Sequence, residues 1–415
     1  MSGDPQVENV DVAIVGGGPA GLAAATALGA AGVGSVVVLE RESEPGGIPR
    51  HCGHQGFGLR DLHRSLSGPR YAARRAELAV EAGVALRTNA QVTGWSDSGA
   101  LEITSPRGRS LLETRASVLA TGCRERPRAA RLVPGARPHG VMTTGALQQL
   151  VYLHKRRPGR RAVVVGAEHV SFSALLTLGH GRTRAVAMVT EQPRHQTLAA
   201  FRVTAALRFR TPVLTQTRLT GIFGSPRVEE VELTHVVTGE VRRLACDIVV
   251  FTADWVPDHE LAVLAGVALD PGTRGPAVDS GLHTTQAGLF AAGNVLHGAE
   301  TADVAALSGG RVAESVIRYL AGDPWPTARV PIECEAPLHW IAPNAVIALG
   351  SRAQPPFRLR AREILGSQHV SVSQAGRTLW RGRVTRLMPG RSTHLASSWT
   401  AAVDVQGAPV VVRAV

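Results

Sequence analysis

A glycine-rich turn between a short apolar strand and a helix is the feature of this chain that most limits its fold. Residues 11–15 (DVAIV) have the composition of a buried parallel strand, and GGGPAG follows directly. In Gly16-x-Gly18-x-x-Gly21, the glycines permit a tight turn, close approach of a pyrophosphate and packing of the helix on the strand. Glu40 ends the next strand and can accept bonds from ribose hydroxyls. The segment therefore predicts a βαβ unit that binds a dinucleotide.

The same pattern begins again near residue 161. The run RRAVVVGAEHVSFSALLTLGH reads as strand, turn and helix, and RAVAMVTE reads as the next strand. Residues 212–245 alternate like an antiparallel meander, and the last eighty or so residues alternate at period two. We expect an α/β fold with two Rossmann-like domains, the second inserted in the first, and a small C-terminal β domain. The expected boundaries are 1–125 with 246–325, then 126–245, and finally 331–415.

Charge and hydropathy limit the partners. The net charge is +12, but it is almost entirely arginine, and its densest run, HKRRPGRR at 154–161, is broken by proline and glycine. We expect no nucleic-acid binding; a basic face that docks an acidic redox partner fits better. The N-terminus lacks the pattern of a signal peptide, and glycines interrupt the most apolar stretch, 12–39, so no transmembrane segment is predicted. The expected location is the cytoplasm, or the membrane periphery through a partner.

The four cysteines are too far apart for a disulfide framework, a zinc ribbon or an iron–sulfur ligand set. Cys52 lies between His51 and His54 in GGIPRHCGHQGFG. A single cysteine cannot cycle as an internal dithiol, and neighbouring residues in such a run seldom converge on one ion, so no metal site is predicted. These three side chains are candidates for catalysis or for lining a cofactor pocket, and simple core packing is an equally good interpretation.

Two further segments, SVLATGCRERP and TTQAGLFAAGNV, resemble the ATG and T-x-x-x-G-[LIV]-[FY]-A-x-G-D motifs of flavoproteins related to the pyridine nucleotide–disulfide oxidoreductases. The resemblance implies an FAD-dependent oxidoreductase, in which the N-terminus of a helix near Asp303 points at the flavin N1/O2 edge. This chain has Asn294 where the family has aspartate. The implied FAD-binding residues are Gly16, Gly18, Pro19, Ala20, Gly21, Glu40, Arg41, Gly47, Arg50, Val92, Ala120, Thr121, Gly122, Gly293, Asn294 and Asp303.

The motif GGxxRHCxHxxFG, with LVPGARPHGVMTTGALQQL and FTADWVPDHELA, resembles a particular branch of these flavoproteins. That branch contains subunits of the cyanide-synthase and opine-oxidase type, together with the α subunits of heteromeric proline and sarcosine oxidising enzymes. The resemblance implies an electron-transfer subunit of an amino-acid or amine dehydrogenase, working with a second flavoprotein subunit. Because the C-terminal region holds only Cys334, a [2Fe–2S] cluster is expected on a separate small protein.

The second fingerprint departs from the pattern. It reads Gly166-Ala-Glu168-His-Val-Ser171, so two of the three glycines are missing and a carboxylate stands where a pyrophosphate would approach. The sequence therefore argues against NAD(P) binding in the second domain. Two alternatives stay open: a self-sufficient NAD(P)H-dependent flavoprotein reductase, and a non-catalytic scaffold that binds a nucleotide structurally.

Overall fold

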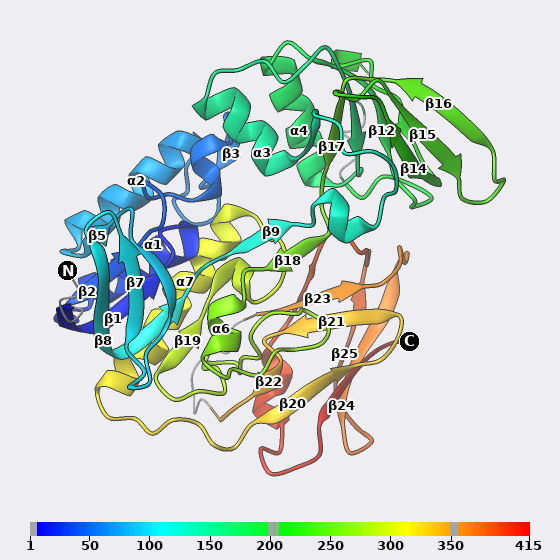
Figure 1. Ribbon diagram of the computed structural model, residues 1–415. Coiled ribbons are helices and arrows are strands. Elements are labelled where there is room, and N and C mark those ends of the chain that lie inside the picture. The colour runs from blue at the N-terminus through cyan, green and yellow to red at the C-terminus, as the bar shows by residue number, and fades with distance from the viewer. Residues whose placement is uncertain (1–5, 198–202, 204–206, 349–355) are drawn as a thin grey trace. The chain divides into compact units, whose positions relative to one another are not determined.

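The computed structural model describes residues 6–197, 203, 207–348 and 356–415 (Figure 1). Part of the N-terminal segment considered above, residues 1–5, lies outside the described residues. The chain divides into two compact units. The first contains Met1–Arg50, Gly56–Arg124 and Val256–Val415, and the second contains His51–Gln55 and Glu125–Trp255.

A seven-stranded sheet forms the centre of the first unit, in the order β5-β2-β1-β8-β7-β6 with β19 paired to β8. Strands β5, β2, β1, β8 and β19 run parallel, whereas β8, β7 and β6 form an antiparallel meander. The bounds are β1 Gln6–Val15, β2 Val36–Leu39, β5 Ala85–Arg87, β6 Gln91–Trp95, β7 Leu101–Ser105, β8 Gly108–Leu119 and β19 Leu289–Ala291. This is the predicted βαβ unit, extended by a meander.

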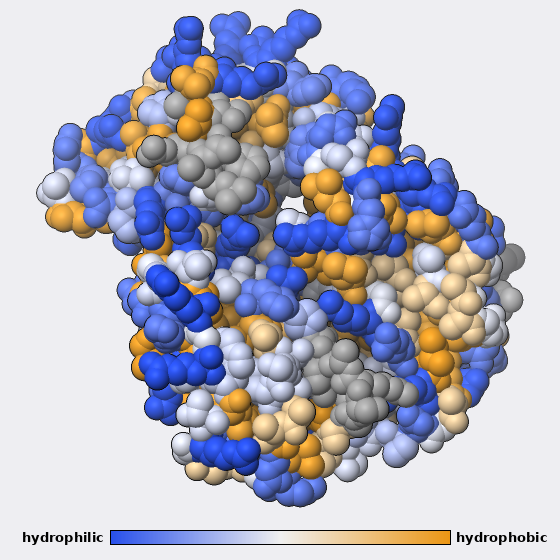
Figure 2. Space-filling model, turned by 180° about the vertical axis from the view of Figure 1, so that it is seen from behind, coloured by the Kyte–Doolittle hydropathy of each residue, from blue (hydrophilic) through white to orange (hydrophobic). Residues whose placement is uncertain are grey.

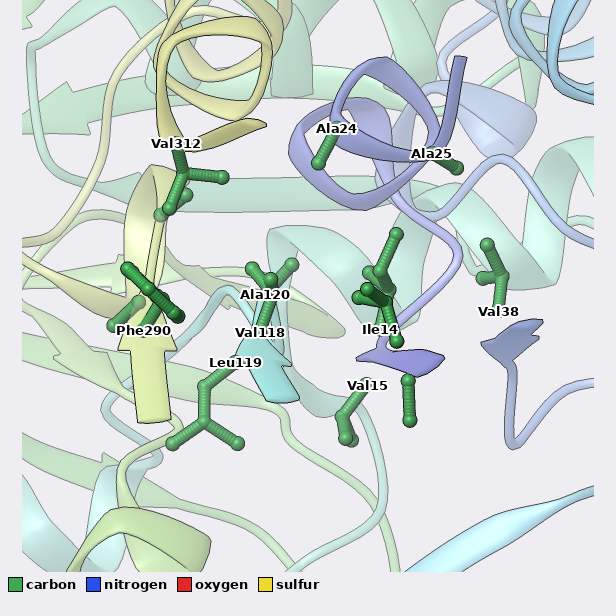
Figure 3. Packing of buried hydrophobic residues seen from close by; sticks show 14 of the residues in the cluster. Ile14, Val15, Ala24, Ala25, Val38, Val118, Leu119, Ala120, Phe290 and Val312 are labelled. Atoms are coloured by element: carbon green, nitrogen blue, oxygen red, sulfur yellow. The ribbon is translucent and has the colours of Figure 1, made fainter. Parts of the chain in front are cut away.

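Two helices, α1 (Pro19–Ala30) and α7 (Ala302–Leu320), pack together over this sheet. Figure 3 shows Ala24 and Ala25 of α1 above Ile14 and Val38, and Val312 of α7 above Phe290. The alanine-rich sequence of α1 reflects this close packing, because small side chains allow the two backbones to approach. Even a Cβ atom at Gly309 of α7 would overlap the carbonyl oxygen of Ala20.

The second unit repeats the parallel architecture. Its five-stranded sheet has the order β10-β17-β11-β12-β13, and a three-stranded antiparallel sheet β14-β15-β16 accompanies it. Strand β17, which follows the boundary predicted at 245, pairs with β10 and β11, so residues 246–255 lie with the second unit rather than the first. The bounds are β10 Val141–Thr143, β11 Arg161–Val165, β12 Arg184–Val189, β13 Val213–Leu214, β14 Thr217–Phe223, β15 Glu230–His235, β16 Val241–Ala245 and β17 Ile248–Phe251.

The helices of the second unit follow the strands. Helix α4 (His169–His180) connects β11 to β12, as the repeated pattern predicts. Helix α3 (Thr144–Gln148) follows β10 and continues as a π-helical turn, Gln149–Leu153. A 3-10 turn, Arg128–Arg131, precedes β10.

The C-terminal residues form two sheets, β22-β20-β27-β24-β25 and β21-β23-β26, within the first unit. Their shared core includes Trp399, Phe357, Leu359 and Val372. The bounds are β20 Val330–Cys334, β21 Leu338–Ala342, β22 Ala345–Val346, β23 Phe357–Ala361, β24 Gln368–Gln374, β25 Arg377–Val384, β26 Thr393–Leu395 and β27 Val410–Ala414, with a 3-10 turn at Ser398–Ala402.

The connecting elements of the first unit include one further helix, α2, which covers Gly68–Glu81. Pro69 lies in the first turn of the helix, where proline is tolerated, and Ser67 is its N-cap. The preceding residues form turns and short strands. The remaining elements are the 3-10 turn Ile48–His51, β3 Gln55–Phe57, β4 Leu66–Ser67, β9 Cys123–Glu125, β18 Trp255–Pro257, α6 Glu260–Leu264 and the 3-10 turn Gly293–Val295.

Hydrophilic residues cover much of the face seen in Figure 2, with hydrophobic residues between them, as on most folded domains. Among the described residues, no helix combines the length and the apolar character needed to cross a membrane.

Candidate functional site

Four parallel strands of the first unit end in one row. In the sheet register, Leu39, Val15, Leu119 and Ala291 lie side by side at the carboxyl ends of β2, β1, β8 and β19. The next residue of each strand continues the pattern, so the predicted residues Gly16, Glu40 and Ala120 emerge at the same edge. In open α/β sheets, ligands bind in the crevice outside this edge. Widely separated sequence motifs are thus brought to one place by strand pairing.

The turn after β1 leaves the beginning of α1 accessible to a ligand. Gly16 has φ of 109°, and its α-hydrogen faces the Ala120 carbonyl so closely that a Cβ would lie 2.5 Å from that oxygen. A Cβ at Gly18 would meet no atom within 4 Å. No side chain caps α1, and Pro19 lies in its first turn. Ala20 and Gly21 follow in that turn, where backbone N–H groups and the helix dipole favour an anion.

Glu40 is buried and already fixed by the backbone. Its Oε2 accepts from the Gly17 amide at 2.9 Å, and its Oε1 accepts from the Glu42 amide at 2.8 Å. Each carboxylate oxygen has a further lone pair, which is available to a ribose hydroxyl. The bond from Gly17 ties the position of the acid directly to the glycine turn.

A second glycine pair lies against the first. The Gly46 amide donates to the Gly17 carbonyl at 2.7 Å, and a Cβ at Gly47 would lie 3.0 Å from the Gly18 Cα. Arg50 follows and pairs with Glu42 at 2.9 Å, while Arg41 is exposed. Val92 is buried in β6 as part of the core. The predicted residues 46–50 therefore form one wall of the crevice.

Two other loops complete the edge of the sheet. Thr121 donates its hydroxyl to the Asp258 carbonyl at 2.7 Å, and the Asp258 amide donates to the Gly122 carbonyl at 2.9 Å. After β19, a Cβ at Gly293 would come within 2.5 Å of the Ala20 Cβ, so this loop packs against the first turn of α1. Both loops are therefore fixed by contacts with neighbouring segments of the first unit.

The structure gives Asn294 a definite role inside the loop that precedes α7. Its Oδ1 accepts from the Glu300 amide at 2.9 Å, and its Nδ2 donates to the Glu300 carbonyl at 3.2 Å. An aspartate at this position could accept but not donate. Asp303 is buried in the first turn of α7, where its Oδ1 accepts from the Val304 amide at 2.9 Å and from the Thr301 hydroxyl.

The second unit has the same row of strand ends, but the turn is filled. Val189, Val165, Phe251 and Thr143 are in register there. Glu168 is the N-cap of α4, and its carboxylate accepts from the Ser171 amide, while Ser171 Oγ accepts from the Glu168 amide at 3.2 Å. The Thr252 hydroxyl donates to Glu168 Oε1 at 2.5 Å. The carboxylate is therefore buried at the place where the fingerprint of the first unit leaves open space.

A second carboxylate caps the neighbouring helix. Glu125 Oε2 accepts from the Gly145 amide in the first turn of α3 at 2.9 Å. Burial raises the pKa of Glu125 to about 7. Arg131 lies above the Phe251 ring, with Cζ 5.2 Å from the ring centroid, and donates to the carbonyls of Thr252 and Ala253. Its charge favours the ionised form of Glu125, against the larger effect of burial.

The cysteine singled out by the sequence is a buried thiol of the second unit. Cys52 Sγ lies 3.4 Å from Gln148 Oε1, and Gln148 in turn donates to Ser173 Oγ at 3.1 Å. Burial raises the pKa of Cys52 to about 12. His51 is buried, and His54 is half-buried with Nδ1 2.9 Å from the Gln55 carbonyl. Within the described ranges, no group of His, Cys, Asp and Glu side chains is arranged to hold a metal ion.

Sequence reasoning did not identify Glu125 or Thr252. Both act through contacts with residues far along the chain; the bond between Thr252 and Glu168, for example, spans 84 positions. No local pattern marks a residue whose partner lies across the sheet.

We predict that native Cys52 is alkylated by iodoacetamide about a thousandfold more slowly than in the urea-unfolded chain, because a pKa near 12 leaves almost no thiolate at pH 8. Peptide mass spectrometry after timed quenching measures this rate. The half-buried Cys123 serves as an internal control, and similar native and unfolded rates for Cys52 would contradict the prediction.

We predict that Glu125→Gln changes the pH dependence of stability. The folded chain binds the Glu125 proton up to pH about 7 and the unfolded chain only to pH about 4.5, so the free energy of unfolding falls as pH rises between these values. From pH 5 to pH 8, E125Q should gain roughly 3 kcal/mol relative to the unmodified chain in urea unfolding. Glu240→Gln, at an exposed turn of the same unit, should show no such gain.

Comparison with known proteins agrees with this geometry. A family model described as pyridine nucleotide-disulphide oxidoreductase matches residues 10–309. An opine oxidase subunit of Agrobacterium tumefaciens (strain Ach5) is 28% identical over 328 residues, covering 71% of this chain and 63% of that protein. Thioredoxin reductase of Treponema pallidum (strain Nichols) is 28% identical over 294 residues, covering 69% of this chain and 88% of that protein. The chain thus spans less than two thirds of the opine oxidase protein.

The fold has a close match among crystal structures. Lactococcus lactis thioredoxin reductase superimposes with a TM-score of 0.64 at 21% identity, over 75% of this chain and 99% of that chain. This match shows the fold, two Rossmann-like domains of which the second is inserted in the first. The open turn at α1, the fixed acid Glu40 and the wall at Gly47 fit the dinucleotide that the family binds. The chain therefore belongs to the pyridine nucleotide-disulphide oxidoreductase family and is a flavin-dependent oxidoreductase.

Proposed function

We propose that this chain is the electron-transfer subunit of a heteromeric amino-acid or amine dehydrogenase of the opine, glycine or proline type, with bound FAD and without bound NAD(P). Similarity to opine oxidase subunits from two bacteria supports the heteromeric role. In this proposal, Gly16, Gly18 and Gly21 hold the pyrophosphate and Glu40 the adenosine ribose. The loops 120–122 and 293–303 hold the flavin end.

The observation that carries the proposal is the Glu168 carboxylate at the N-terminus of α4. It occupies the position that the pyrophosphate of a nicotinamide dinucleotide needs, and it accepts from the Ser171 amide and the Thr252 hydroxyl. A phosphate entering this turn would have to displace a buried, hydrogen-bonded carboxylate of like charge. An FAD enzyme without a nicotinamide site requires another electron donor, and a partner protein is the natural source.

The proposal assigns separate roles to the cofactor, to this chain and to its partner proteins. Bound FAD would supply the acceptor for two electrons and their onward transfer, while this chain's residues bind and orient it. A second flavoprotein subunit would oxidise the amine, and a small [2Fe–2S] protein would accept the electrons. The arginine-rich surface would favour encounter with an acidic partner. We place the complex in the cytoplasm.

The experiment is an anaerobic visible spectrum of the FAD-loaded chain, before and after addition of NADH or NADPH. We expect the flavin absorbance to be unchanged by either nucleotide and to bleach with dithionite, which shows that the flavin is reducible. Prompt bleaching by NADH or NADPH would contradict the proposal and identify a self-sufficient reductase. A folded chain that retains no flavin would instead identify a nucleotide-binding scaffold.

A second experiment changes the turn that Glu168 fills and includes a matched control variant. Glu168→Gly removes the buried carboxylate and restores a glycine in the fingerprint, so ADP-ribose should raise its melting temperature but not that of the unmodified chain. Glu191→Gln, an exposed acid of the same unit, should respond like the unmodified chain. If ADP-ribose stabilised all three proteins equally, Glu168 would not be what closes the site.

A further inference from the structure

One sheet of the C-terminal β residues has a cationic face. In β23 (Phe357–Ala361), Phe357, Leu359 and Ala361 point into the apolar core, so Arg358 and Arg360 lie on the opposite face. The register places Arg360 beside Trp340 of β21 and Arg358 beside His394 of β26. On a free sheet this face would meet water, but Arg360 is only 9% exposed. Other residues of the first unit therefore cover Arg360 on this face of the sheet.

Arg360 is held by an aromatic ring rather than by a close ion pair. Its Cζ lies 4.8 Å from the centroid of the Trp340 ring, and the His297 ring stacks on the same Trp340 side chain at 4.8 Å. Among the described residues, its Nε and Nη2 have no hydrogen-bond partner, and neither has His297 Nδ1. Glu300 Oε1 is 3.9 Å from Nη2 and accepts from the Ser392 hydroxyl. Buried donors without partners are costly and indicate a missing ligand.

The position of Arg360 identifies that ligand. Glu300 directly precedes Thr301, the N-cap of α7, and its backbone is fixed by the Asn294 amide. Cys123 is the residue after Gly122, and its electrostatic interaction with Arg360 raises the pKa of that arginine, against the larger lowering by burial. Arg360 therefore lies near the loop 293–303, through Glu300, and within electrostatic range of the loop 120–122, through Cys123; both loops are assigned to the flavin end of the cofactor.

The charges around Arg360 are not balanced. Arg358 faces the same side of the sheet, and Glu300 is the carboxylate nearest to Arg360. His297 contributes no positive charge near neutral pH, because burial lowers its pKa to about 4. A guanidinium remains charged even when it is buried, so the face presents net positive charge to whatever lies beside it.

We propose that Arg360 of the C-terminal β residues completes the flavin site by presenting its guanidinium to the pyrimidine edge (N1 and O2) of the ring. Negative charge develops on that edge when a flavin is reduced, and a preorganised cation stabilises it, in addition to the dipole of α7. This inference rests on FAD binding and on the assigned loops. It is independent of the absence of NAD(P) and of the partner subunits.

The test compares variants of the FAD-loaded chain. Arg360→Gln removes the charge, Arg360→Lys keeps it, and Arg381→Gln changes an exposed arginine of the neighbouring strand β25. The readouts are the midpoint potential of the bound flavin and the dissociation constant of sulfite, an anionic probe that adds to the ring and places charge on the same edge. R360Q should weaken binding of the reduced form, relative to the oxidised form, about tenfold or more. A tenfold change lowers a two-electron potential by about 30 mV.

R360K should retain most of the flavin midpoint potential of the unmodified chain, and R381Q should leave that potential unchanged. Glu300→Gln removes the negative charge that opposes Arg360. It should therefore raise the midpoint potential of the flavin and tighten sulfite binding. A loss of packing would not produce changes in this direction. An R360Q protein with the potential and sulfite affinity of R381Q overturns the proposal. If R360Q fails to fold or to retain FAD, E300Q decides: an upward shift supports the site, and no shift overturns it. The NADH experiment above is unaffected by either result.

Discussion

The N-terminus of the helix that follows the first parallel strand is the point on which each unit of this protein depends. The unpaired N–H groups and the helix dipole require a negative partner there. In the first unit no side chain caps α1, and the space above Gly18 is open. In the second unit the chain supplies its own anion, Glu168, and holds it with the Thr252 hydroxyl. The same architecture thus leaves this helix end open in one unit and closes it with a carboxylate in the other.

Sequence periodicity and the glycine fingerprint were sufficient to predict the two Rossmann-like units, because both are local properties of the chain. The role of Glu168 was only half predictable. A carboxylate in a glycine position excludes a phosphate, but its own hydrogen-bond partner is distant in sequence. The boundary near residue 245 shows the same limit, because strand β17 joins a sheet whose other strands lie earlier in the chain.

Asn294 illustrates how a departure from a family motif can be explained by the surrounding loop. The family motif has an aspartate at this position. The structure uses both halves of the amide on the backbone of Glu300, which an aspartate could not do. The loop before α7 is therefore closed by a side chain that accepts and donates, and the position of Glu300 becomes a consequence of that closure. The substitution is coupled to the local fold.

Buried charges distinguish the two units more sharply than their folds do. In the second unit, Glu168 is the N-cap of α4 and Glu125 accepts from an amide in the first turn of α3. The charge of Arg131 favours the ionised form of Glu125. In the first unit, Arg360 is buried with two donor atoms that lack partners in the described part of the chain. Because folding penalises a buried charge that is not compensated, such an arrangement persists where a ligand supplies the compensation. The buried guanidinium of Arg360 thus belongs to the unit in which the N-terminus of the first helix is open, whereas the second unit holds a carboxylate at the equivalent helix end.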